Sequence, residues 1–318
     1  MAAKSYHRLL IFVSLVLLAT AVFSPWLAAL WEYVIDRHPE WQEYRYPFSR
    51  IFDRFFMISG IILFFAFRRR LGIESLRHYG LGPFRQGYPD FVRGFLLALG
   101  SLVALALLMT LANIFTPYLR LSAAVSLERI LKALLAAITV GFLEEFFFRG
   151  MIFKGLREDW HLPGALIVTN VFYSAIHFVR PFEKKPLSGI EPWAGLHYLI
   201  HSFEPFLDLS AVLPGIFGLF LIGAVLSYAF LRTGSLYLSI GLHAGWVFGL
   251  KSLRVFGDYR RAELGWLFGF SEPKLVSGVA GWAGILLVGL FVHAVTRGRR
   301  GFRTERDKTA QASPTITQ

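Results

Sequence analysis

The stretch ILKALLAAITVGFLEEFFFRG, from Ile130 to Gly150, decides the fold class of this chain. Most of its side chains are apolar, and it is as long as the roughly 20 residues that an α-helix needs to cross a bilayer. Two adjacent carboxylates, Glu144 and Glu145, stand near its end and are followed by Arg149. The stretch therefore predicts a membrane helix, and its charges mark a candidate functional site.

Apolar stretches of similar length recur along the whole chain. Hydrophobic residues make up 55% of the 318 residues, and within each stretch they are continuous and do not alternate with polar ones. Continuous stretches predict helices, since only helices and closed barrels satisfy their backbone in lipid and barrel strands alternate. We predict an all-α fold, a polytopic membrane helix bundle with about eight transmembrane helices, at approximately 9–30, 51–67, 91–114, 130–153, 162–180, 209–231, 235–250 and 278–296.

The charge balance indicates a membrane surface as the partner. The formal net charge is +12, and the basic residues cluster in loops and near the C-terminus, where anionic lipid would attract them. No basic domain lies outside the predicted helices, so we expect no nucleic acid partner. Cysteine is absent, which excludes disulfides, a thiol nucleophile and thiolate metal ligands.

We divide the chain into four segments by composition. Residues 1–127 would hold N-terminal transmembrane helices and a basic loop, and residues 128–250 the catalytic core. Residues 251–296 would hold a second basic loop and the last transmembrane helix, and residues 297–318 a basic, disordered tail. The positive-inside rule places both termini in the cytoplasm.

The helix that carries the charges separates its two carboxylates. Glu145 and Arg149 are four residues apart, share one helix face and can form an ion pair. Glu144 is rotated by about 100° from Glu145, so we expect it to face the interior of the bundle in a different environment. A purely structural polar network between helices is the alternative reading of these charges.

Two histidines are expected near the same depth in the bilayer. Glu144 precedes Asp159, in a predicted turn, by 15 residues, and His177 follows it by 18, so both lie roughly 22–27 Å from the turn. His243 follows Gly234, in a turn on the same side, by nine residues, which corresponds to about 14 Å. Glu144, His177 and His243 could therefore converge near the middle of the membrane.

Three motifs resemble those of a known family. EEFFFR, Glu144–Arg149, fits an EExxxR pattern, YSAIH, Tyr173–His177, is close to FxxxH, and HAGWV, His243–Val247, resembles the start of an HxxxN/D motif. In this order on consecutive membrane helices they resemble the CPBP family of CAAX prenyl endopeptidases and bacteriocin-processing intramembrane proteases, also called ABI. The resemblance covers about residues 128–250.

The resemblance implies an intramembrane glutamic-type endopeptidase. Glu144 would be the general base that activates water, and Glu145 and Arg149 would support the site by pairing. His177 and His243 would assist the water or stabilise the developing oxyanion. No cofactor is implied, and the alternative is a divalent metal such as zinc, held by the same residues.

The same resemblance suggests partners and location. The substrate would be a membrane-associated protein or peptide, cleaved within the lipid bilayer by an integral, multi-pass protein of the bacterial inner membrane. Two rival functions stay open: a metal-dependent membrane hydrolase, and a non-catalytic immunity or scaffold protein. A transporter is disfavoured because the chain has no recognisable repeats.

The chain departs from the family pattern at two positions. Tyr173 stands where Phe is usual, which keeps the aromatic ring. Val247 stands where the family has Asn or Asp, a proposed oxyanion partner, so this departure is the more serious one. Asn170 and Ser239 are candidates for a replacement polar group.

Overall fold

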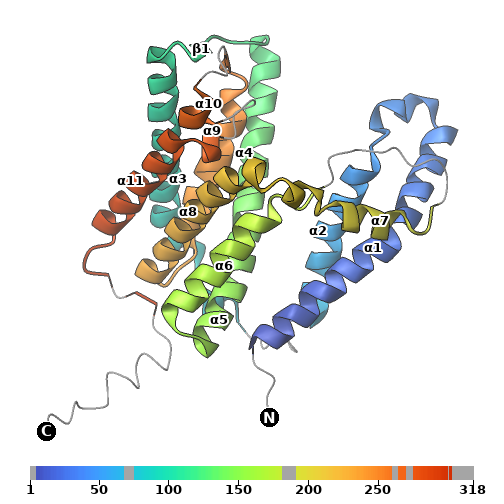
Figure 1. Cartoon of the computed structure of the whole chain (residues 1–318), viewed down its shortest axis with the longest axis horizontal. Coiled ribbons are helices and arrows are strands. Elements are labelled where there is room, and N and C mark those ends of the chain that lie inside the picture. Colours follow the sequence, from blue (N-terminus) through green and yellow to red (C-terminus); the bar gives the residue numbers. More distant parts are fainter. Residues whose placement is uncertain are drawn as a thin grey trace, which may run out of the picture. The chain divides into compact units, whose positions relative to one another are not determined.

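The computed structural model describes residues 5–67, 75–180, 191–259, 264–269, 275–299 and 301–302. Helices dominate this part of the chain, so the predicted all-α fold is confirmed (Figure 1). The chain divides into two compact units, residues 1–74 with 175–212 and residues 75–174 with 213–318. Most of the predicted tail, from residue 303 onward, lies outside the described residues.

The first unit is a helical hairpin with a short helix packed against it. Its elements are α1 (Ser5–Arg37), η1 (Pro39–Tyr44), α2 (Phe48–Phe67), α7 (Ala194–His201) and η4 (Glu204–Leu207). Ala28 of α1 packs against Phe48 and Phe52 of α2, and Tyr198 of α7 covers them. The rings of Phe52 and Tyr198 are 4.6 Å apart, so aromatic packing holds α7 on the hairpin.

The second unit contains the candidate site. Its elements are η2 (Leu76–Tyr79), α3 (Phe84–Leu111), β1 (Phe115–Pro117), α4 (Ala123–Glu145), the π-helical η3 (Phe146–Phe153), α5 (Lys154–Asp159), most of α6 (Leu162–Ile176), most of α8 (Leu209–Thr233), α9 (Tyr237–Leu253), β2 (Gly257–Tyr259), α10 (Gly265–Phe268), η5 (Leu275–Ser277) and α11 (Val279–Val295).

The eight predicted stretches all coincide with helices, with different ends. The predicted helix 130–153 is part of a longer helical run, α4, η3 and α5, which extends from Ala123 to Asp159. The predicted end at residue 180 is wrong, because α6 ends at Ile176. Among the described helices, three are long and apolar enough to cross a membrane, at Leu10–Arg37, Leu76–Leu111 and Leu209–Thr233. The number of spans stays a prediction.

Helix α9 is the centre of the second unit and packs against both α3 and α4 (Figure 1). It presents glycine at every fourth position, Gly241, Gly245 and Gly249, to α3. A Cβ atom on Gly241 would lie 2.0 Å from the carbonyl oxygen of Phe91, and one on Gly245 2.5 Å from that of Phe95. Glycine is therefore needed here, since it lets two membrane helices approach to backbone contact.

Helix α4 approaches α9 in the same manner. It buries Ala133, Ala137, Gly141 and Glu145, again at every fourth position. A Cβ atom on Gly141 would lie 3.1 Å from the backbone nitrogen of Ala244 in α9. Glu145 thus ends a stripe of small residues, and this stripe turns its carboxylate toward α9.

A short strand pair joins the far ends of α3 and α9. Strands β1 and β2 are antiparallel, with Phe115 opposite Tyr259. Just beyond β1, Arg120 reaches Asp258 with its Nε 3.1 Å from the carboxylate oxygen. These contacts fix the loops that follow the two helices, so α3 and α9 are held at that end as well as along their length.

We expect Gly245→Ala to destabilise the protein by about 1–3 kcal/mol, since the added methyl must push the α3 backbone away. Thermal unfolding in detergent micelles measures this effect. The matched control is Gly100→Ala on α3, where no heavy atom of the described residues lies within 4 Å of the new Cβ. Alanine is the better helix former at both positions, so equal melting temperatures for the two variants would contradict the close packing.

Candidate active site

Glu145 and Arg149 form a fully buried ion pair. Arg149 Nη1 donates to Glu145 Oε1 at 2.8 Å, and both side chains are 0% exposed. The pair expected from the i,i+4 spacing is therefore present. Arg149 Nη2 also donates to the carbonyl of Gly223 in α8 at 3.1 Å. Because a buried charge must be paired and hydrogen-bonded, this contact ties α8 to the end of α4.

Aromatic rings complete the surroundings of the guanidinium. Its central carbon lies 4.4 Å from the ring centre of Tyr173 and 5.9 Å from that of Phe148. The two rings meet edge to face, 5.0 Å apart. Tyr173, which stands where the family has Phe, thus supplies a ring face that attracts the cation.

His243 lies between the two carboxylates. Its Nδ1 is 2.8 Å from Glu145 Oε1, and its Nε2 is 3.7 Å from Glu144 Oε2. An ionised carboxylate only accepts hydrogen bonds, so Nδ1 carries a hydrogen and is the donor in the bond to Glu145. The imidazole is 4% exposed and stands edge-on to Tyr173, with ring centres 6.4 Å apart. Its orientation is therefore fixed from two sides, with Nε2 directed toward Glu144.

The two glutamates differ in exposure as their positions on the helix predict. The Glu145 side chain is 0% exposed, whereas that of Glu144 is 30% exposed. Glu145 already accepts from Arg149 and His243. Glu144 is thus the more exposed of the two carboxylates.

The helix changes its winding directly after these carboxylates. Glu144 and Glu145 are the last residues of α4, and the π-helical segment Phe146–Phe153 follows and contains Arg149. The change in pitch falls between the carboxylates and their guanidinium partner. Such π segments within α-helices are rare and frequently occur at functional sites.

His177 does not lie inside a helix as predicted. It follows Ile176, the last residue of α6, in a turn, and its side chain is exposed. It belongs to the first unit, whereas the four other candidate residues lie in the second. Its convergence with Glu144 and His243 stays a prediction.

The polar groups considered as replacements near Val247 have other contacts. Ser239 Oγ donates to the carbonyl of Leu226 at 2.9 Å, which ties α9 to α8. Asn170 Oδ1 accepts from Ser227 Oγ at 3.2 Å, which ties α6 to α8. Val247 itself lies one turn after His243, on the same face of α9, and presents an apolar side chain there.

The alternative of a bound metal ion was compared with the positions of the possible ligand side chains. In the part of the chain that the structure describes, no three His, Asp or Glu side chains form a group that could hold a metal ion. His197 and His201, one turn apart on α7, have ring centres 3.9 Å apart, and His201 pairs with Glu204.

A comparison with known protein families gives a match in the middle of the chain. Residues 126–249 match the family model of the Rce1-like type II CAAX prenyl endopeptidases. This segment is therefore similar to the Rce1-like proteases. The match confirms the resemblance to the CPBP family, and it includes all five candidate site residues. The protein is accordingly a membrane protease. No curated protein and no solved structure matches the chain significantly.

Two features of this segment could not be read directly from the motifs. The carbonyl of Gly223 accepts from Arg149, and a backbone carbonyl within an apolar helix gives no signal in the sequence for such a contact. The spacing of Gly241, Gly245 and Gly249 does give a signal, since small residues four apart indicate close helix packing in membranes. That pattern could have predicted the central place of α9.

We expect Arg149→Met to destabilise the protein by about 3–5 kcal/mol, because Glu145 would keep a buried charge without its guanidinium. Thermal unfolding in micelles measures the loss. Lys132→Met is the control, since it breaks the exposed Glu128–Lys132 pair, which has the same i,i+4 spacing in the same helix. The double variant Glu145→Gln with Arg149→Met should recover part of the stability. If Arg149→Met melts like Lys132→Met, the buried pair is not essential.

Proposed function

We propose that the protein is an intramembrane endopeptidase in which Glu144 activates the water that cleaves a peptide bond. One observation carries the proposal: His243 lies between the two carboxylates, bound to Glu145 through Nδ1 and facing Glu144 through Nε2. The separation of 3.7 Å on the Glu144 side exceeds a direct hydrogen bond. Both groups can therefore act on one atom placed between them.

The roles divide by environment. Arg149 neutralises Glu145, and Glu145 in turn holds the Nδ1 proton of His243, so the imidazole keeps one orientation. Glu144, the more exposed carboxylate, is left to take a proton from water. This division resembles other sites in which paired titratable groups receive separate tasks from their surroundings.

The proposed step balances without a covalent intermediate. Glu144 takes a proton from water while the oxygen forms a bond to the carbonyl carbon of the substrate. An N–H of His177, or Nε2 of His243 once that imidazole carries a second proton, stabilises the negative charge on the carbonyl oxygen. The carbon–nitrogen bond then breaks, and Glu144 returns its proton to the amine that leaves.

The proposed substrate is a membrane-associated protein or peptide, in a bacterial inner membrane. The matched family model is described as a prenyl endopeptidase, so a peptide with a prenylated C-terminus is the first substrate to test. A membrane-associated substrate is consistent with the surface of the helices, since α4 and α8 carry exposed apolar side chains such as Leu135 and Phe217, which would face lipid in a membrane.

We expect Glu144→Gln to lower kcat about 10²–10⁴-fold, the usual contribution of a general base, without lowering the melting temperature. The measurement is cleavage of a prenylated reporter peptide by purified protein in micelles. Glu128→Gln, on the same helix and exposed, is the control and should keep wild-type activity.

A chelator separates the rival mechanisms in the same assay. Cleavage that resists chelation and depends on Glu144 supports the proposal. Loss of activity on chelation, restored by zinc, would replace the glutamate mechanism with a metal-dependent one. A well-folded wild type that cleaves neither prenylated nor unprenylated membrane peptides would favour a scaffold or immunity protein.

We expect Val247→Asn to raise kcat about tenfold, a fraction of the 10²–10³ that a well-placed oxyanion donor contributes. Val247 lies one turn from His243, so an amide there would reach the same region of the site. Val247→Ala is the matched control, because it makes space without adding a donor. An Asn variant no faster than the Ala variant would mean that the oxyanion is stabilised elsewhere.

A further inference from the structure

An apolar groove runs along the second unit, away from the candidate active site. Its volume is about 520 Å³, and it is lined mainly by α3 and α11, with Ile222 of α8 and Trp246 of α9. None of the lining residues is Glu144, Glu145, Arg149 or His243. The groove is therefore lined by residues other than these candidates.

The groove has the length and polarity of a site for one hydrocarbon chain. On α3 its lining extends from Leu96 to Leu108, which corresponds to about 18 Å of helix. This is close to half of the roughly 30 Å hydrocarbon core, the depth of one leaflet. The hydroxyl of Ser101, which lines the groove, donates to Ala98 and accepts from Trp246, so it needs no polar ligand.

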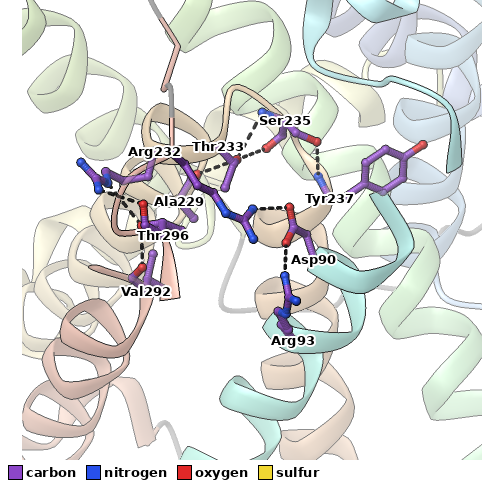
Figure 2. A network of polar contacts seen from close by, with 10 residues as sticks. Asp90, Arg93, Ala229, Arg232, Thr233, Ser235, Tyr237, Val292 and Thr296 are labelled. Carbon is purple, nitrogen blue, oxygen red and sulfur yellow. Dashed lines mark hydrogen bonds and ion pairs between the residues drawn. The ribbon is translucent and has the colours of Figure 1, made fainter. Parts of the chain in front are cut away.

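Arginines stand at the end of the groove where α3 begins. Arg93 lies one turn before Leu96 and Leu97, and it donates to Asp90 at 3.1 Å (Figure 2). Arg299, from the segment after α11, donates to the other oxygen of Asp90 at 2.7 Å. Asp90 thus binds two guanidinium groups, one through each carboxylate oxygen, and neutralises only one of their charges.

A third arginine approaches the same end from α8. Arg232 donates to the side chain and the carbonyl of Thr296, just after α11, at 3.2 and 2.9 Å (Figure 2). The following segment is also attached to α8, because Phe302 N donates to Leu231 O at 2.8 Å. Between these two contacts with α8, Arg299 reaches Asp90 of α3.

We propose that this groove, with Arg93 and Arg299 at its end, binds an anionic phospholipid. An acyl chain would lie along α3 and α11, and the phosphate would lie at Arg93 and Arg299. Charge complementarity decides the occupant, since guanidinium groups bind phosphate in a bidentate manner and the arginines follow directly on a groove whose printed lining is uncharged. Basic pockets between membrane helices bind acidic headgroups in this way.

Such a lipid would connect α3 and α11, which contact each other and both line the groove. The Asp90–Arg299 pair is a further link between α3 and the segment after α11. A chain in the groove would fill the space between the two helices. Bound phospholipid should therefore raise the melting temperature as well as remain with the purified protein.

The test uses the full chain in neutral detergent, with phosphatidylglycerol and phosphatidylcholine of identical acyl chains. Retained lipid is counted by native mass spectrometry, and thermal unfolding is followed in parallel. We expect selective retention of phosphatidylglycerol and a higher melting temperature with it. Replacing both Arg93 and Arg299 by Gln should weaken phosphatidylglycerol binding about 25-fold, or about fivefold for each arginine.

A second variant tests the groove itself. Gly284 lines the groove, and a Cβ built there meets no neighbouring element of the described residues within 4 Å, so Gly284→Phe is chosen to place a bulky side chain in the groove. This variant should reduce retention of both lipids at least tenfold. Arg85→Gln, an exposed change at the start of α3, is the control and should bind as the wild type does.

Three results would overturn the proposal: equal retention of the two lipids by the wild type, wild-type retention by the double Gln variant, or wild-type retention by Gly284→Phe. If Gly284→Phe lost binding of a prenylated peptide but still retained phospholipid, the proposal would also be overturned. The groove would then be a substrate site. Glu144→Gln should bind lipid normally, so a failure of the catalytic proposal stays distinguishable.

Discussion

The buried pair of Glu145 and Arg149 is the interaction on which the rest of the site depends. Two charges with 0% exposure persist in an apolar bundle only because each is matched by the other and by further hydrogen bonds. Arg149 therefore contacts α8 through Gly223, and Glu145 contacts α9 through His243. One ion pair thus determines how three elements meet, and it fixes the imidazole that faces Glu144.

Close helix packing makes this interaction possible. Glu145 can reach His243 because α4 and α9 are lined by alanine and glycine where they meet, and α9 is in backbone contact with α3 on another face. Larger side chains at these positions would increase the distance between the helices beyond the reach of a 2.8 Å hydrogen bond. The small residues take no part in the proposed reaction, yet the distances between the charged side chains depend on them.

The sequence was sufficient for the fold class, the helices and the Glu145–Arg149 pair, since these follow from apolar length and from helical spacing. It also separated Glu144 from Glu145, because adjacent residues must point about 100° apart. It could not reveal the hydrogen bond between His243 and Glu145, which depends on the rotation of α9 against α4. The π-helical segment and the end of α6 before His177 were likewise missed, since both depend on tertiary packing that local patterns do not encode.

The adjacency of the two carboxylates now has a physical reason. The stripe of small residues on α4 directs Glu145 inward, where Arg149 and His243 use its oxygens as acceptors. Glu144 occupies the preceding position on the helix. Its side chain points in a different direction from that of Glu145, yet it remains near the same imidazole. A carboxylate one turn away would share the face of Glu145 and its burial. Adjacent acids thus give one imidazole two carboxylate neighbours of different exposure, which is the condition that separate roles in water activation require.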